Sequence, residues 1–119
     1  MEEKLNLRIQ RTDNLNDVYY EDKVGPGNGY HNYTVKRDGE TLLAVQFQNG
    51  PRNVEGSIPG VVEADLIEIV RHRLQCFQKG EFATRENACA LTHLEEALMW
   101  MNKRTADRKE QGTLGTYKK

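Results

Sequence analysis

The chain of 119 residues has only two cysteines and no long apolar run. Cys76 and Cys89 form no C-x-x-C pair, and no second Cys/His pair stands at zinc spacing, so neither a disulfide framework nor a metal site is expected. No apolar stretch approaches the roughly 20 residues of a membrane-spanning helix. The acidic start, MEEKLNLRIQ, is unlike a signal peptide. The sequence therefore predicts two free thiols in a soluble, intracellular protein that contacts no membrane.

An excess of either charge is also missing. Lys and Arg number 17 and Asp and Glu number 18, which gives a formal net charge of -1. A strongly positive field draws proteins to DNA or to anionic membranes, so neither partner is expected, and an anionic ligand needs a local cluster of cations. Hydrophobic residues make up 37% of the chain. Because they fall in periodic segments, the sequence predicts a folded single domain over residues 1–119 rather than disorder.

Familiar catalytic patterns are absent too. The chain has no G-x-S-x-G and no Walker loop, and HLEEA at 93–97 is not H-E-x-x-H. GPGNG at 25–29 reads as a loop that opens no helix, so it is no dinucleotide fingerprint. Cys89 would need a partnering base to act as a nucleophile. His93, one helical turn later, is the alternative that keeps catalysis open, although both residues could equally pack or face solvent.

Residues 1–56 read mainly as β-strands. LNLRI at 5–9 alternates between apolar and polar residues, and VYYEDKV at 18–24 is a second candidate strand. The strongest signal is Asp38-Gly39, because both central residues of a type I′ hairpin turn need positive φ. The expected pairs across this hairpin are Arg37 with Glu40, Val35 with Leu42, and Tyr33 with Ala44.

Residues 60–80 are predicted to form a first helix. Its apolar stripe, at spacings of four and three residues, consists of Val62, Leu66, Val70, Leu74 and Phe77. Gly60 is the expected N-cap, with Glu63 completing a capping box. Gly80 fits the left-handed position that ends a helix.

Residues 84–110 are predicted to form a second, longer helix. Thr84 is a good N-cap, and Glu86 places a negative charge at the positive end of the helix dipole. Spacings of alternately four and three residues define a seam with a 3.5-residue period. The seam consists of Asn87, Leu91, Leu94, Leu98, Met101, Thr105 and Arg108. Residues 111–119 are expected to form an extended tail.

The fold class that follows is α+β, with an N-terminal antiparallel β-sheet followed by two long C-terminal α-helices. A helix of about 26 residues is roughly 39 Å long, whereas a compact domain of this size is roughly 35 Å across. Met99 and Trp100 lie off the seam and add apolar surface. We therefore expect a homo-oligomer, in which a second copy covers this surface.

The two ends of the seam carry polar clusters suited to nucleotides. Phe77, Arg85 and Asn87 stand at one end. An aromatic ring stacks on a base, an asparagine amide pairs with an adenine edge, and an arginine binds phosphate. The cluster at the other end consists of Lys103, Arg104, Thr105, Arg108 and Lys109. The alternatives are a core Phe77, a surface pair of Arg85 with Glu86, and a solvated helix end.

Several segments resemble a known phage family. FQNGP at 47–51, the block LQCFQKGEFATRENACALTHLEEALMWMNKRTADR at 74–108 and the closing GTLGTY are similar to the Thoeris anti-defence proteins of the first-described family. Those proteins are sponges that sequester glycocyclic ADP-ribose made by bacterial TIR enzymes. The helical block also resembles phage anti-CBASS sponges for cyclic oligonucleotides. The likeness covers about residues 25–117.

The resemblance implies an antiparallel sheet followed by two long helices, assembled as a dimer or as a hexamer built as a trimer of dimers, with ligand pockets between protomers. It implies that Phe77 stacks on adenine and that Asn87 reads its edge. Arg85 and Arg52 would meet the diphosphate, and Asn49 in the FQNGP stretch would join this pocket.

A second pocket, for cyclic trinucleotides, would use Arg104, Thr105 and Arg108. The resemblance further implies a non-enzymatic protein without cofactors, acting in the cytoplasm of the infected bacterial host on a small-molecule nucleotide messenger. An enzyme that degrades such messengers, and a sponge for cyclic oligonucleotides only, remain the alternatives.

Overall fold

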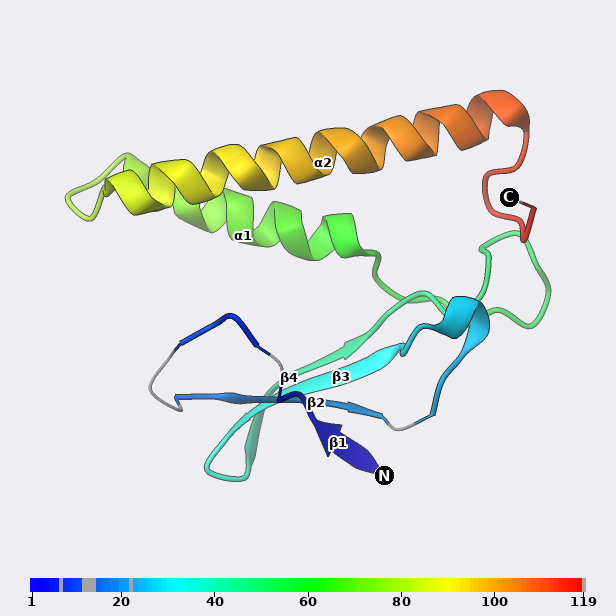
Figure 1. Ribbon diagram of the computed structural model, residues 1–119, viewed down its shortest axis with the longest axis horizontal. Coiled ribbons are helices and arrows are strands. Elements are labelled where there is room, and N and C mark those ends of the chain that lie inside the picture. The colour runs from blue at the N-terminus through cyan, green and yellow to red at the C-terminus, as the bar shows by residue number, and fades with distance from the viewer. Residues whose placement is uncertain (7, 12–14, 22, 119) are drawn as a thin grey trace. The chain divides into compact units, whose positions relative to one another are not determined.

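The computed structural model describes residues 1–6, 8–11, 15–21 and 23–118. The chain divides into two compact units, which we call the sheet unit (Met1–Val61) and the helix unit (Val62–Lys119). The sheet unit contains a four-stranded antiparallel sheet, and the helix unit contains two helices (Figure 1). The predicted α+β class, with a sheet before two C-terminal helices, is therefore confirmed.

The four strands pair in chain order, each antiparallel to the next. They are β1 (Glu2–Lys4), β2 (Asp17–Glu21), β3 (Asn32–Arg37) and β4 (Glu40–Gln46), with a 3-10 turn η1 (Pro26–Asn28) between β2 and β3. The strand predicted at 5–9 is wrong, because the strand ends at Lys4 and Ile9 is 99% exposed. Leu7 lies outside the described residues. The ladder stops there because β2 begins at Asp17, so the Leu5 N–H donates to the Val18 carbonyl as the last rung.

The hairpin between β3 and β4 turns at Asp38 and Gly39. Their φ values of 51° and 80° confirm the predicted positive-φ turn. The pair of Arg37 with Glu40 is also confirmed, but the register shifts by one residue between Val35 and Lys36. The observed pairs are Lys36 with Thr41, Val35 with Leu43, and Tyr33 with Val45. The predicted pairs with Leu42 and Ala44 are therefore wrong, because a β-bulge inserts one extra residue into β4.

One face of the sheet carries a group of aromatic rings, and the other combines ion pairs with the Tyr19 ring, which lies 5.0 Å from Lys36 Nζ. Tyr20 pairs with Tyr33 across β2 and β3, and the Tyr33 ring lies 5.6 Å from the Phe47 ring, edge to face. On the other face, Lys36 pairs with Glu2 at 2.9 Å. This contrast is typical of an antiparallel sheet that has one solvated face and one face rich in apolar and aromatic residues.

The first helix, α1, spans Glu63–Gln78 and begins differently from the prediction. Its N-cap is Val62, whose N–H donates to the Asp65 carboxylate at 2.9 Å. Gly60 instead lies in the sheet unit, where an added Cβ would stand only 2.5 Å from the carbonyl oxygen of Gln46. The predicted cap by Gly60 and Glu63 is therefore wrong, since close backbone contact explains the glycine.

The second helix, α2, spans Arg85–Gln111 and matches the prediction closely. Thr84 is the N-cap, and its hydroxyl accepts the Asn87 N–H at 3.0 Å. Gly112, with φ of 74°, ends the helix in the left-handed conformation. The predicted seam is half-buried from Asn87 to Met101, whereas Thr105 is exposed. The middle of the seam is therefore confirmed as a half-buried face of α2, and α2 lies alongside α1 (Figure 1).

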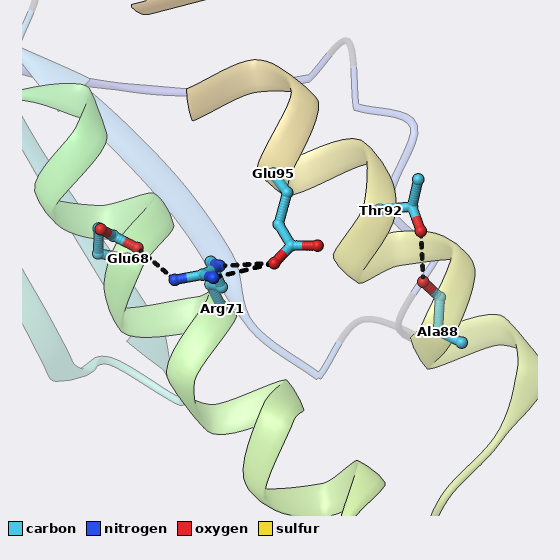
Figure 2. A network of polar contacts seen from close by, with 5 residues as sticks. All are labelled: Glu68, Arg71, Ala88, Thr92 and Glu95. Atoms are coloured by element: carbon cyan, nitrogen blue, oxygen red, sulfur yellow. Dashed lines mark hydrogen bonds and ion pairs between the residues drawn. The ribbon is translucent and has the colours of Figure 1, made fainter. Parts of the chain in front are cut away.

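A charged contact joins the two helices in the helix unit (Figure 2). Arg71 on α1 donates from Nε and Nη2 to the Glu95 carboxylate on α2, at 3.0 and 2.9 Å, and from Nη1 to Glu68 at 3.4 Å. The hydrogen bonds to Glu95 raise the pKa of Arg71 above its ordinary value, against an opposing effect of desolvation. This contact links α1 to α2 at one point along their length.

Burial is shallow throughout the described chain. Thr113, at 5% exposure, is its one buried polar residue, and none of its hydrophobic side chains is buried. Met99 and Trp100 on α2 are 66% and 72% exposed. Within the described ranges, neither α1 nor α2 is both long and apolar enough to cross a bilayer.

Candidate ligand-binding sites

The turn between α1 and α2 is held by a side-chain clamp. The Gln78 amide donates to the Thr84 carbonyl at 2.9 Å, and its oxygen accepts the Thr84 N–H at 2.9 Å. Two further backbone bonds close the turn, from Lys79 N–H to the Cys76 carbonyl and from Gly80 N–H to the Phe77 carbonyl. Gly80 does not have positive φ, so its predicted left-handed role is wrong. The clamp, and not a glycine, brings the chain back.

The clamp also places Asn87. Thr84 is held by Gln78, and the Thr84 hydroxyl accepts the Asn87 N–H, so the first turn of α2 is anchored to the end of α1. Asn87 is half-buried at the start of the seam. Its side-chain amide makes no hydrogen bond to the described residues, and an amide of this kind has two donors and an acceptor to offer. Asn87 is thus a fixed and unused amide at this end of the hairpin.

Phe77 and Arg85 lie at the same end of the helix unit as Asn87. Phe77 is half-buried one residue before the end of α1, and Arg85 is the exposed first residue of α2. Arg85 forms no ion pair with the described residues. The structure therefore brings three of the predicted site residues to one turn, with an aromatic ring, an amide and a cation.

A further residue, Arg73 on α1, contacts one of the candidate site residues, Phe77. The Arg73 guanidinium lies over the Phe77 ring, 5.0 Å from its centre. The spacing of four residues on one helix was an available signal, because side chains at i and i+4 share a face. Gln78 was missed as well, and its contact with Thr84 spans a turn that no helical spacing predicts.

Asn49 and Arg52, the other predicted members of this pocket, belong to the sheet unit. Asn49 is half-buried and exchanges backbone hydrogen bonds with Ile58 at 2.9 and 2.8 Å. Arg52 is exposed in the turn after Pro51, whose carbonyl accepts the Ser57 hydroxyl at 2.7 Å. The turn is locally well held, and a shared pocket of these two residues with Phe77 stays a prediction.

The far end of α2 forms a second candidate site, an open cavity of about 420 Å³. It is lined by Arg104, Arg108, Gln111, Thr116, Tyr117 and Lys118. Arg108 donates from Nη2 to the carbonyls of Thr113 and Thr116, at 2.7 and 3.0 Å. The residues after α2 thus fold back onto the helix, so the predicted extended tail is wrong. Three cations and a tyrosine make this a surface for an anion that carries a ring.

Thr105 differs from its two arginine neighbours. Its hydroxyl donates to the Met101 carbonyl at 3.1 Å, and it does not line the cavity. The structure therefore brings together Arg104 and Arg108 but leaves Thr105 outside. Tyr117 and Lys118 join them only because the tail folds back, which helical spacing did not indicate.

The alternative catalytic pair is not formed. His93 contacts Glu96 at 3.5 Å, and no contact joins it to Cys89 in the described structure. Cys76 and His72 do approach each other, with Sγ and Nε2 3.8 Å apart. No group of three or more His, Cys, Asp or Glu side chains suited to a metal occurs among the described residues. Both candidate sites offer ring, amide and cation contacts, which suit binding.

Two comparisons with known proteins bear on these sites. Residues 40–106 match a family described as Acb2/Tad1, hairpin domain. A protein named Thoeris anti-defense 1, from Bacillus phage SBSphiJ7, is 50% identical over 95 residues. That alignment covers 80% of this chain and 66% of the relative, so the chain spans just under two thirds of the relative's length.

Proposed function

The chain belongs to the Acb2/Tad1 hairpin family, and from this premise we propose that it is a phage anti-defence protein. In this proposal it binds and sequesters a cyclic ADP-ribose-type immune messenger, glycocyclic ADP-ribose, without cleaving it. It would act in the cytoplasm of the infected bacterial host and so block Thoeris signalling. The name of the Bacillus phage relative supports the Thoeris assignment.

The observation that carries the proposal is the presence of three side chains at the α1–α2 turn, each of which offers a contact that suits a nucleotide. Phe77 offers a ring face on which adenine stacks, a contact of about 1–3 kcal/mol per base. Asn87 offers an unused amide that can both donate to and accept from the adenine edge. Arg85 offers an unpaired guanidinium for the diphosphate. Arg52 and Asn49 are proposed as further ligand contacts.

The test is retention of the intact messenger. The protein is incubated with glycocyclic ADP-ribose, washed and heat-denatured, and the released compound is identified by mass spectrometry. We expect intact ligand, with Phe77→Ala weakening affinity roughly tenfold or more. Phe82→Ala is the matched control, because it removes a second ring from the same turn that is not among the proposed ligand contacts. Release of a degraded product would favour the enzymatic alternative, and absence of retained ligand would contradict the sponge.

The cavity at the far end of α2 favours a second candidate function. Arg104, Arg108 and Lys118 offer three positive charges, and Tyr117 offers a ring, so a cyclic di- or trinucleotide would find contacts for both phosphate and base. This pocket would serve CBASS messengers, and the protein could bind them in addition to glycocyclic ADP-ribose or instead of it.

The two sites are separable by substitution. Arg104→Ala is expected to weaken cyclic trinucleotide binding about tenfold and to leave glycocyclic ADP-ribose binding unchanged, with Phe77→Ala doing the reverse. Isothermal titration calorimetry measures both. Loss of trinucleotide binding in Phe77→Ala but not in Arg104→Ala would move that ligand to the α1–α2 turn.

A further inference from the structure

Two arginines on α1 have very different surroundings. Arg71 and Arg73 stand two positions apart, so they project about 200° apart around the helix. Arg71 donates to Glu95 and Glu68 (Figure 2). Arg73 forms no ion pair with the described residues, and its one described contact is the Phe77 ring at 5.0 Å. Arg71 is therefore committed to the helix pair, while Arg73 keeps its charge available.

We propose that Arg73 is a further ligand-binding residue, whose guanidinium lies over the Phe77 ring and yields that face to the base of the ligand. The inference rests on the proposed function, since it concerns the same site at the α1–α2 turn. The ligand class it fits is an adenine nucleotide with a diphosphate. Arg73 would meet either the far face of the stacked base or the negative charge of its phosphates.

The position of Phe77 explains why this exchange is needed. Phe77 is half-buried, so part of its ring surface is taken up within the helix unit. The guanidinium of Arg73 lies against the ring, and a base that stacks on this face must replace it. The arginine side chain is long and flexible enough to move while its charge remains near the ring.

The energies favour the exchange. An exposed cation–π contact contributes roughly two- to fivefold to an equilibrium, whereas a stacked base contributes roughly five- to 150-fold. The released guanidinium is planar, so it can stack on the base or bind two phosphate oxygens at once. Arg73 therefore loses a weak contact and gains a stronger one when the ligand enters.

The positive charge of Arg73 also attracts an anionic ligand before the two are in contact. The chain has a formal net charge of -1 and no global positive field, so an anionic ligand depends on local cations. Arg73 adds to Arg85 at this turn, and neither is neutralised by an ion pair among the described residues. Removing Arg73 should therefore weaken binding and also reduce its dependence on salt.

The experiment compares Arg73 variants by calorimetric titration with glycocyclic ADP-ribose at roughly 0.05 and 0.5 M NaCl. We expect Arg73→Ala and Arg73→Met to raise Kd about tenfold at low salt and to flatten its salt dependence, with Arg73→Lys in between. Lys23→Ala is the charge-matched control, because Lys23 is an exposed cation of the sheet unit and belongs to neither candidate site, so it is expected to leave Kd unchanged.

The outcomes separate the two claims. Wild-type Kd in both Arg73→Ala and Arg73→Met, or tighter binding, would overturn the inference and leave the proposed function intact. Failure of the wild-type protein to bind glycocyclic ADP-ribose would overturn the proposed function and this inference with it. A circular dichroism melt of each variant checks folding, and Arg73→Met keeps the apolar stem that covers Phe77 should Arg73→Ala be unstable.

Discussion

The amide of Gln78 holds the α1–α2 turn through two hydrogen bonds to the Thr84 backbone, each 2.9 Å long. Gln78→Ala removes both and leaves the Thr84 N–H and carbonyl to solvent. Since each such bond contributes about 0.5–1.5 kcal/mol net, and this turn is partly exposed, we expect the free energy of unfolding to fall by about 1–2 kcal/mol. Urea unfolding monitored by circular dichroism measures the loss.

The matched control is Gln75→Ala, one turn earlier on α1. Gln75 is half-buried like Gln78, but its side chain makes no hydrogen bond to the described residues. If Gln78 acts through the turn, Gln78→Ala should also weaken ligand binding by loosening Asn87, whereas Gln75→Ala should leave binding unchanged. Equal losses of stability in the two variants would mean that the clamp adds nothing beyond the helix itself.

Single residues were predictable where the cause is local. Thr84 was identified as the N-cap because a threonine oxygen satisfies a free N–H at a helix start, and the structure has this bond to Asn87. Gln78 was not identified, because its partner lies six residues away across a turn whose path no periodicity defines. The cap predicted at Gly60 is wrong because a glycine is needed there for a different reason. Its backbone lies against Gln46, the last residue of β4, and against the two residues that follow it, and this contact is distant in sequence.

At the scale of elements, the Arg71–Glu95 contact links α1 to α2. We expect Arg71→Met to lower the thermal midpoint at low salt and to do so less at roughly 0.5 M NaCl, where exposed charges are screened. The raised pKa of Arg71 means that its contribution is present below the unfolded-state pKa and is lost only as pH rises through the higher folded value. The effect should therefore not change between neutral and moderately alkaline pH.

A variant that exchanges the charges of Arg71 and Glu95 provides the control for this ion pair. Arg71→Glu with Glu95→Arg restores the opposite charges across the two helices and should recover much of the midpoint, while each single reversal places like charges together. A double variant no more stable than the single ones would show that the arginine acts through its apolar stem.

Helices, strands and turns were predictable where a local sequence pattern determines them. They were less predictable where packing between strands determines the pairing. The Asp38-Gly39 turn follows from positive φ at both positions, and the seam of α2 follows from the 3.5-residue period. The bulge after Val35 does not follow from either. It moves Leu43 and Val45, in place of Leu42 and Ala44, opposite Val35 and Tyr33, a choice made by the apolar face of the sheet rather than by the turn.

At the scale of the whole molecule, the shortage of buried apolar surface is the main physical fact. Neither unit encloses a buried hydrophobic side chain among the described residues, although folding depends mainly on such burial. In the helix unit, α2 has 27 residues against 16 in α1, and it continues past the start of α1 (Figure 1). The order of strands and helices was predictable from the sequence, because hydrophobic periodicity and turn residues are local signals. The depth of burial was not predictable, because it depends on how several elements pack together.

Trp100, the only tryptophan, tests whether a second copy of the chain covers the exposed apolar surface of α2. It is 72% exposed in a single chain, and an exposed tryptophan beside Met99 favours association. We expect sedimentation velocity to give a multiple of 13.7 kDa, and tryptophan emission to be blue-shifted and to move toward the red on dilution. Trp100→Lys should lower the sedimenting mass, whereas Ile9→Lys, at a fully exposed position in the sheet unit, should not. A wild-type protein of 13.7 kDa with solvent-exposed emission at all concentrations would show that the α2 surface stays uncovered.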